Sequence, residues 1–128
     1  MKISAEVYGT LPDGREVYSY TLENNSMKVE ILNYGGIVKN LYLPDRNGRI
    51  ADVVLGHAGF EQYLENKGHL GCVVGRNANR IAGAVCSVFD EKVELEANNG
   101  ANNLHSGSNN LAHRLFTSEI HTFNNLPA

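Results

Sequence analysis

Short segments that alternate apolar and polar residues, separated by turn-forming residues, are the feature that most restricts the fold of this chain. Residues 27–31 place an apolar side chain at every second position, which is the period of a strand with one buried face. Asn47-Gly48 is a strong hairpin signal. Comparable strand-like segments lie at 15–22, 37–43, 51–55, 81–95 and 115–123. This pattern predicts an all-β protein, an antiparallel sandwich or barrel.

One segment has the period of a helix instead. Within residues 59–65, Phe60, Tyr63 and Leu64 fall at positions i, i+3 and i+4, so that one face of a short helix would be apolar. No internal repeat or low-complexity linker divides the sequence, and 128 residues suit one domain. We therefore predict a β domain with at most one or two short helices.

The composition is that of a soluble globular protein, with 42% hydrophobic and 20% charged residues. A formal net charge of −3 gives no sign of a nucleic-acid or anionic-membrane partner. The N-terminal residues hold no apolar run typical of a signal peptide, so we expect a cytoplasmic protein. Cys72 and Cys86 are then expected to be free thiols. The oligomeric state stays open.

Two polar segments stand out against the strand pattern. Residues 75–81 read Gly-Arg-Asn-Ala-Asn-Arg-Ile, and residues 102–107 read Asn-Asn-Leu-His-Ser-Gly. Arginine and asparagine supply directional hydrogen bonds, and histidine titrates near neutrality. These residue types suit a site for a neutral, polyhydroxylated ligand. The alternative remains that His105 is a structural loop residue and that Arg76 and Arg80 form an ordinary surface pair.

Other kinds of site lack the residues that they need. His69 and Cys72 have the spacing of two zinc ligands, but two further ligands at matching separation are not evident. The sequence has no phosphate-binding Gly-Lys-Ser/Thr loop, no recognisable carboxylate pair for glycoside hydrolysis and no Gly-x-Ser-x-Gly nucleophile motif. We expect no metal and no cofactor.

Five segments together resemble the aldose 1-epimerase (galactose mutarotase) family, and they occur in the family's order. They are residues 33–36, 44–48, 52–56, 75–81 and 98–107. The resemblance implies an all-β, antiparallel β-sandwich of the galactose mutarotase-like supersandwich type. It also implies that residues 1–128 are the N-terminal part of a single such domain, truncated at its C-terminal end.

The resemblance implies interconversion of the α and β anomers of a free hexose, such as galactose or glucose, by acid–base catalysis. Asn79, Arg80 and His105 correspond to family residues that line the sugar site, with His105 as the candidate catalytic residue. The family's glutamate base and second-histidine acid belong to its C-terminal part. The chain by itself is therefore expected to be inactive.

Departures from the family pattern keep alternatives open. Ser106 stands where the family has the first glycine of His-Gly-Gly, and Ala101 stands where proline is common. One alternative is a non-catalytic carbohydrate-binding module, and another is a structural β domain. A third is an epimerase for a phosphorylated hexose, for which the candidate basic residues are Arg76, Arg80 and Arg114.

Overall fold

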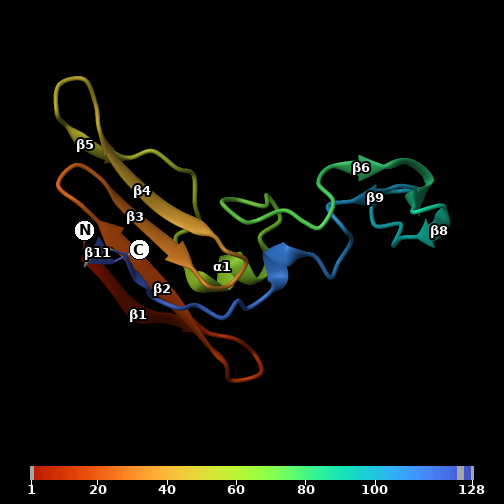
Figure 1. The fold of residues 1–128 in the computed structure, drawn as a ribbon, viewed down its shortest axis with the longest axis horizontal. Helices are drawn as coiled ribbons and strands as arrows, with labels where there is room; N and C mark the ends of the chain where they lie inside the picture. The colour runs from red at the N-terminus through yellow and green to blue at the C-terminus, as the bar shows by residue number, and fades with distance from the viewer. Residues whose placement is uncertain (1, 124–125, 128) are drawn as a thin grey trace.

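A five-stranded antiparallel sheet forms the larger part of the molecule (Figure 1). The computed structural model describes residues 2–123 and 126–127. The strands of this sheet are β1 (Lys2–Thr10), β2 (Glu16–Glu23), β3 (Lys28–Leu32), β4 (Val38–Pro44) and β5 (Ile50–Asp52). Their order in space is their order in the chain, as short turns between successive antiparallel strands require. The predicted all-β antiparallel class is confirmed.

The remaining elements are short. They are α1 (Phe60–Glu65), β6 (Arg80–Ile81), the 3₁₀ turn η1 (Ala82–Ala84), β7 (Val85–Val88), β8 (Glu91–Glu94), β9 (Asn103–Leu104), the 3₁₀ turn η2 (Leu111–His113), β10 (Thr122–Phe123) and β11 (Leu126–Pro127). Strands β6 and β9 pair, β7 and β8 pair, and β10 and β11 pair, each antiparallel. The predicted helix at 59–65 is confirmed as α1. None of the helices among the described residues is long and apolar enough to cross a membrane.

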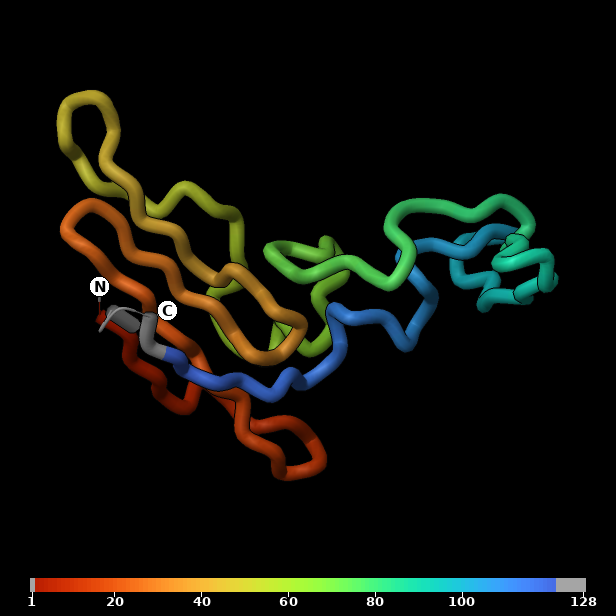
Figure 2. The backbone as a smooth tube through the Cα atoms, viewed as in Figure 1, coloured from red at the N-terminus to blue at the C-terminus, as the bar shows by residue number. Residues whose placement is uncertain are grey.

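The backbone leaves the sheet after α1 and later returns to it (Figure 2). Strands β6, β8 and β9 lie at the end of the molecule away from the five-stranded sheet (Figure 1). On the return, the Gly35 N–H donates to the Arg114 carbonyl at 2.7 Å and the Phe116 N–H donates to the Asn33 carbonyl at 2.8 Å. These bonds join the returning segment to the turn between β3 and β4. We call the part from Gly75 to Asn110 the distal lobe.

Strand β1 is absent from the sequence-based prediction. Its apolar residues do alternate, but Val7 is 51% exposed, and the register shifts between Val7 and Gly9 where β1 pairs with β2. An edge strand with a bulge buries too little of its apolar face to give a clear period of two. The pattern is therefore weaker in β1 than in β3.

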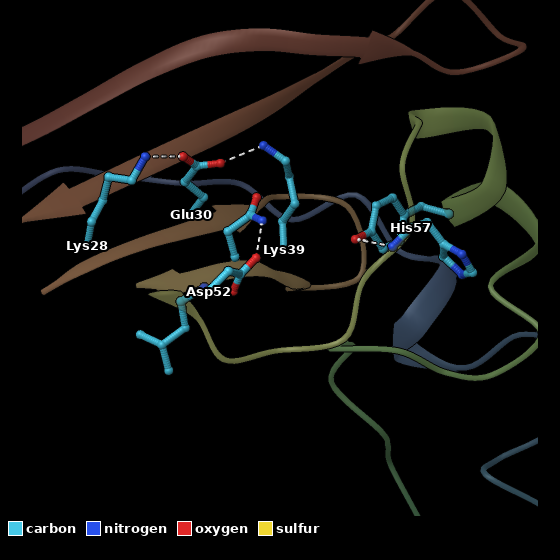
Figure 3. A network of polar contacts seen from close by, with 8 residues as sticks. Lys28, Glu30, Lys39, Asp52 and His57 are labelled. Atoms are coloured by element: carbon cyan, nitrogen blue, oxygen red, sulfur yellow. Dashed lines mark hydrogen bonds and ion pairs between the residues drawn. The ribbon is translucent and has the colours of Figure 1, made fainter. Parts of the chain in front are cut away.

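The predicted strand at 51–55 stops early, at Asp52. The Asp52 carboxylate accepts the N–H of Leu41 at 3.0 Å and of Val54 at 3.2 Å, and it also accepts the Asn40 amide at 2.5 Å (Figure 3). These bonds hold the pKa of Asp52 below its usual range. A side-chain acceptor here competes with the backbone ladder, so the strand gives way to a loop. The segment at 115–123 is likewise mostly loop, with an isolated bridge from Leu115 to Tyr34.

The apolar core lies between the sheet and α1. It consists of Leu11, Val17, Leu32, Tyr34, Ile37, Phe60 and Tyr63. Tyr63 is fully buried, and its hydroxyl oxygen accepts the His57 N–H at 3.0 Å. The aromatic rings of Tyr8 and Tyr34 each pack edge-on against Phe60. Helix α1 is therefore held by two buried aromatic residues from its one apolar face.

Cys72 and Cys86 are both free thiols, as predicted. Burial raises the pKa of the Cys72 thiol, and its Sγ donates to the His69 carbonyl at 3.3 Å. A protonated, hydrogen-bonded thiol is a poor nucleophile and a poor metal ligand. Among the described residues, no group of three or more histidine, cysteine or acidic side chains is arranged to hold a metal ion.

A half-buried ion-pair network crosses the sheet. The Glu30 carboxylate accepts from Lys28 Nζ at 2.7 Å and from Lys39 Nζ at 2.6 Å (Figure 3). Burial raises the pKa of Glu30, but the hydrogen bonds from the two lysines outweigh burial and leave that pKa below its ordinary value of 4.5. The network joins neighbouring strands β3 and β4 by their side chains.

We predict that Gly9→Ala destabilises the protein. A Cβ at Gly9 would overlap the ring of Phe60, which is 6% exposed and belongs to the core. Overpacking of this kind costs about 1–3 kcal/mol. Urea unfolding followed by circular dichroism measures the loss. Gly68→Ala is the matched control, because a Cβ there meets only the Leu70 side chain at 3.4 Å. Equal stability of the two variants would contradict the packing described here.

We also predict that Glu30 makes stability depend on pH. Its pKa is lowered in the folded state, so its contribution is present above about 4.5 and is lost as the pH falls through the lower, folded value. Glu30→Gln should flatten this acid-side loss. Urea unfolding at several pH values from neutral to about 3 measures it. Glu6→Gln, on the exposed part of β1, is the control. An unchanged pH profile in Glu30→Gln would count against the network.

Candidate functional site

The two polar signature segments meet at the pairing of β6 with β9. Arg80 lies opposite Leu104, and Ile81 lies opposite Asn103. The pairing continues beyond the strands, because the His105 N–H donates to the Asn79 carbonyl at 3.0 Å. The predicted site residues Asn79, Arg80 and His105 are therefore neighbours in the fold, although β7, β8 and a loop separate them in the sequence.

Arg80 is oriented by two neutral acceptors. Its Nε donates to Asn99 Oδ1 at 2.9 Å, and its Nη1 donates to Asn79 Oδ1 at 3.2 Å. No ion pair within residues 2–123 involves Arg80. The guanidinium is thus held in place while its charge is not neutralised by a carboxylate, and N–H groups remain to donate to a ligand.

His105 has a defined tautomer. Its Nδ1 accepts the backbone N–H of Asn79 at 3.0 Å, so in the neutral ring the hydrogen is on Nε2. The His69 ring packs edge-on against the His105 ring, with centroids 5.0 Å apart. His105 is therefore fixed on one side by a hydrogen bond and on another by a ring contact, with Nε2–H as the ring's donor.

The backbone at this junction is strained at three residues. Asn79, His105 and Ser106 have φ values of 60°, 52° and 71°, in the left-handed region. Each such residue other than glycine costs roughly 1 kcal/mol, somewhat less for asparagine. Strain of this kind persists only where surrounding bonds determine the conformation, and it is common at functional sites.

Asparagine side chains supply those surrounding bonds. Asn98 forms two bonds with the backbone of Leu104, donating at 2.9 Å and accepting at 2.7 Å. Asn102 accepts the Gly83 N–H at 3.1 Å. Asn103 is fully buried, and its amide donates to the Glu96 carbonyl at 2.8 Å. None of these three residues was among the predicted site residues. The high density of asparagine between residues 98 and 103 could have pointed to them, because asparagine side chains readily form hydrogen bonds with nearby backbone groups.

A cavity of about 450 Å³ opens beside the junction. It is lined by Gly75, Arg76, Asn77, Leu95, Ser106, Asn109, Leu111 and Arg114. Asn79, Arg80 and His105 do not line it. The three arginines considered as a basic cluster are thus divided, with Arg76 and Arg114 at this cavity and Arg80 bonded to asparagines outside it.

Known proteins resemble this chain in sequence. The profile of the aldose 1-epimerase family matches residues 18–125. Galactose mutarotase from Sus scrofa is 36% identical over 121 residues, which are 94% of this chain and 35% of that protein. Aldose 1-epimerase from Escherichia coli K12 is 35% identical over 97 residues, which are 75% of this chain and 28% of that protein.

A solved structure is similar as well. The crystal structure of galactose 1-epimerase from Lactobacillus acidophilus NCFM superposes with a TM-score of 0.79 at 25% identity, covering 96% of this chain and 35% of that one. This chain therefore spans about 35% of the length of these relatives. The match of the family profile to most of the sequence, on a fold shared with a galactose 1-epimerase, shows that the chain belongs to the aldose 1-epimerase family.

Proposed function

We propose that the chain provides the sugar-binding part of an aldose 1-epimerase, which interconverts the α and β anomers of a free hexose such as galactose or glucose. Asn79, Arg80 and His105 bind the sugar. The observation that carries the proposal is a reciprocal pair of hydrogen bonds between Asn79 and His105. The His105 N–H donates to the Asn79 carbonyl, and the Asn79 N–H donates to His105 Nδ1, each at 3.0 Å. This bonding sets three directional polar side chains side by side.

The proposed roles follow from the N–H groups of each side chain that form no hydrogen bond within the described residues. Arg80 donates to sugar oxygens with the N–H groups that Asn79 and Asn99 do not use. His105 donates a hydrogen bond from Nε2–H to a sugar oxygen. Because Nδ1 accepts the Asn79 N–H, the ring keeps this hydrogen and stabilises negative charge that develops on that oxygen while another group moves the proton. His105 thus orients the sugar and assists one proton transfer.

Anomer interconversion needs two coordinated proton transfers. One group removes the proton of the anomeric hydroxyl, the bond from C1 to the ring oxygen breaks, and another group delivers a proton to that oxygen. The aldehyde then rotates, and the ring closes on its other face by the reverse steps. Each positioned acid or base contributes roughly 10²–10⁴-fold. Among the described residues, no carboxylate forms a hydrogen bond or ion pair with Asn79, Arg80 or His105.

A second candidate is an epimerase for a phosphorylated hexose. The cavity beside the junction favours it, because Arg76 and Arg114 both line that cavity. Arginine N–H groups bind phosphate oxygens well. A non-catalytic sugar-binding module would use the same junction and would differ only in lacking catalysis.

We predict that the 128-residue chain binds galactose and that Arg80→Ala weakens binding about tenfold, the effect of losing about 1.4 kcal/mol of hydrogen bonding. Titration followed by amide chemical shifts measures the dissociation constant. Arg46→Ala, in the exposed turn before β5, is the control. Equal affinity of both variants would contradict the assigned site. A preference for galactose 6-phosphate that Arg114→Ala abolishes would favour the second candidate.

We predict that the 128-residue chain has little or no mutarotase activity, since His105 can assist only one of the two transfers. Polarimetry of freshly dissolved α-galactose measures the rate. A longer family protein that contains these residues should be active and should lose activity in His105→Ala. Catalysis by the 128-residue chain at rates typical of enzymes, unaffected by His105→Ala, would show that these roles are wrong.

A further inference from the structure

Ser106 carries a side chain at a backbone conformation that favours glycine. Its φ is 71°, in the left-handed region. A glycine would adopt the same conformation without the steric cost of a Cβ. Hydrogen bonds of the Ser106 hydroxyl offset this cost.

Within the part of the chain that the structure describes, the hydrogen bonds of this hydroxyl are with Asn77. The Asn77 N–H donates to Ser106 Oγ at 2.8 Å. Ser106 Oγ lies 2.8 Å from Asn77 Oδ1 and 3.1 Å from the Asn77 carbonyl oxygen. A hydroxyl has one hydrogen, so it donates to one of these two oxygens at a time. Both residues are half-buried, where hydrogen bonds are stronger than in water.

Asn77 passes this connection on to the buried part of the lobe. Its Nδ2 donates to Asn103 Oδ1 at 2.9 Å, and Asn103 is fully buried. Asn103 Nδ2 in turn donates to the Glu96 carbonyl at 2.8 Å. Ser106, Asn77 and Asn103 thus form a chain of hydrogen bonds, which we call the Ser106 network, that ends on the Glu96 carbonyl.

The Ser106 network adds a cross-link next to the sugar site. Ser106 follows His105, and Asn77 lies two residues before Asn79. The bond between Ser106 and Asn77 is therefore a second connection beside the reciprocal bonds between His105 and Asn79. The Ser106 bond lies beyond the β6–β9 ladder, so it limits how far the ends of the two segments can tilt about that ladder.

We propose that Ser106 is a positioning residue, which acts through Asn77 to hold His105 and Asn79 in the arrangement that binds the sugar. The expected effect on sugar binding rests on the proposed function. The expected effect on the positions of His105 and Asn79 does not. The backbone strain at Ser106 is offset by hydrogen bonds across the two segments. Ser106 itself need not touch the sugar.

The substitution Ser106→Gly should change the geometry of the site while changing the stability of the protein little. Ser106→Gly relieves the backbone strain and removes the hydroxyl, so its effect on stability is small. The arrangement of His105 and Asn79 nevertheless loses the supporting bond between Ser106 and Asn77. We expect a melting temperature within about 5 °C of the wild type, because the two effects oppose each other. We also expect galactose affinity to fall about three- to tenfold.

Nuclear magnetic resonance of the ¹⁵N-labelled 128-residue chain tests the geometry without sugar. The Asn79 amide and the His105 ring nitrogens report their mutual hydrogen bond. Both should shift in Ser106→Gly and in Asn77→Ala, and the double variant should shift no further than the larger single change. Ser108→Ala is the matched control on the same loop. It removes a hydroxyl that contacts Glu96 at 2.8 Å and keeps the Ser108 N–H bond to Glu96 at 2.7 Å.

The outcomes distinguish the two proposals. Shifts of the Asn79 and His105 signals in Ser106→Gly, but not in Ser108→Ala, support the positioning role. Unchanged signals in Ser106→Gly overturn it. If the wild-type chain does not bind galactose, the proposed function fails, while these signals still decide whether Ser106 positions His105.

Discussion

The distal lobe is held together by hydrogen bonds of asparagine side chains rather than by an apolar core, and the candidate site depends on those bonds. The main core residues lie in the sheet, its adjoining turns and α1. In the distal lobe, Phe89 is 96% exposed at the tip of the β7–β8 hairpin, whereas the polar residues Asn103 and Asn110 are buried. Buried polar groups are stable only when their partners are present. Loss of one partner would therefore alter the lobe more than the sheet.

The neutrality of these asparagines has an electrostatic consequence. Asn79 and Asn99 orient the guanidinium of Arg80 as a carboxylate could, but they leave its positive charge unpaired. A charged donor forms stronger bonds to sugar hydroxyls than a neutral donor does. The site remains open to water, because Asn79 and Arg80 are exposed, and water competes for the same donors. The binding of a neutral polyol that we propose for this site is therefore expected to be weak but directional.

The elements that the sequence predicted well are those whose own residues decide their structure. Strand β3 has a period of two, β2 is rich in valine, tyrosine and threonine, and turn signals bound β2, β3 and β4. Helix α1 has two buried aromatic residues on one face. Where a side chain competes with the backbone, as Asp52 does, the predicted strand was too long. Where burial is slight, as in β1, the strand was missed. Both errors arise because the period of apolar residues reports burial and not hydrogen bonding.

The sequence by itself determined the fold class, the short helix, the resemblance to the family and the identity of Asn79, Arg80 and His105 as site candidates, because these depend on local periodicity and on signature residues. Only the tertiary structure decided that Asn79 and His105 bond to each other, that Asn99 orients Arg80, and that Ser106 connects to Asn77. The physical reason is that β6 and β9 are short and distant in sequence. Side-chain bonds from Asn98, Asn102 and Asn103 support this pairing, and no local pattern records which asparagine bonds to which partner.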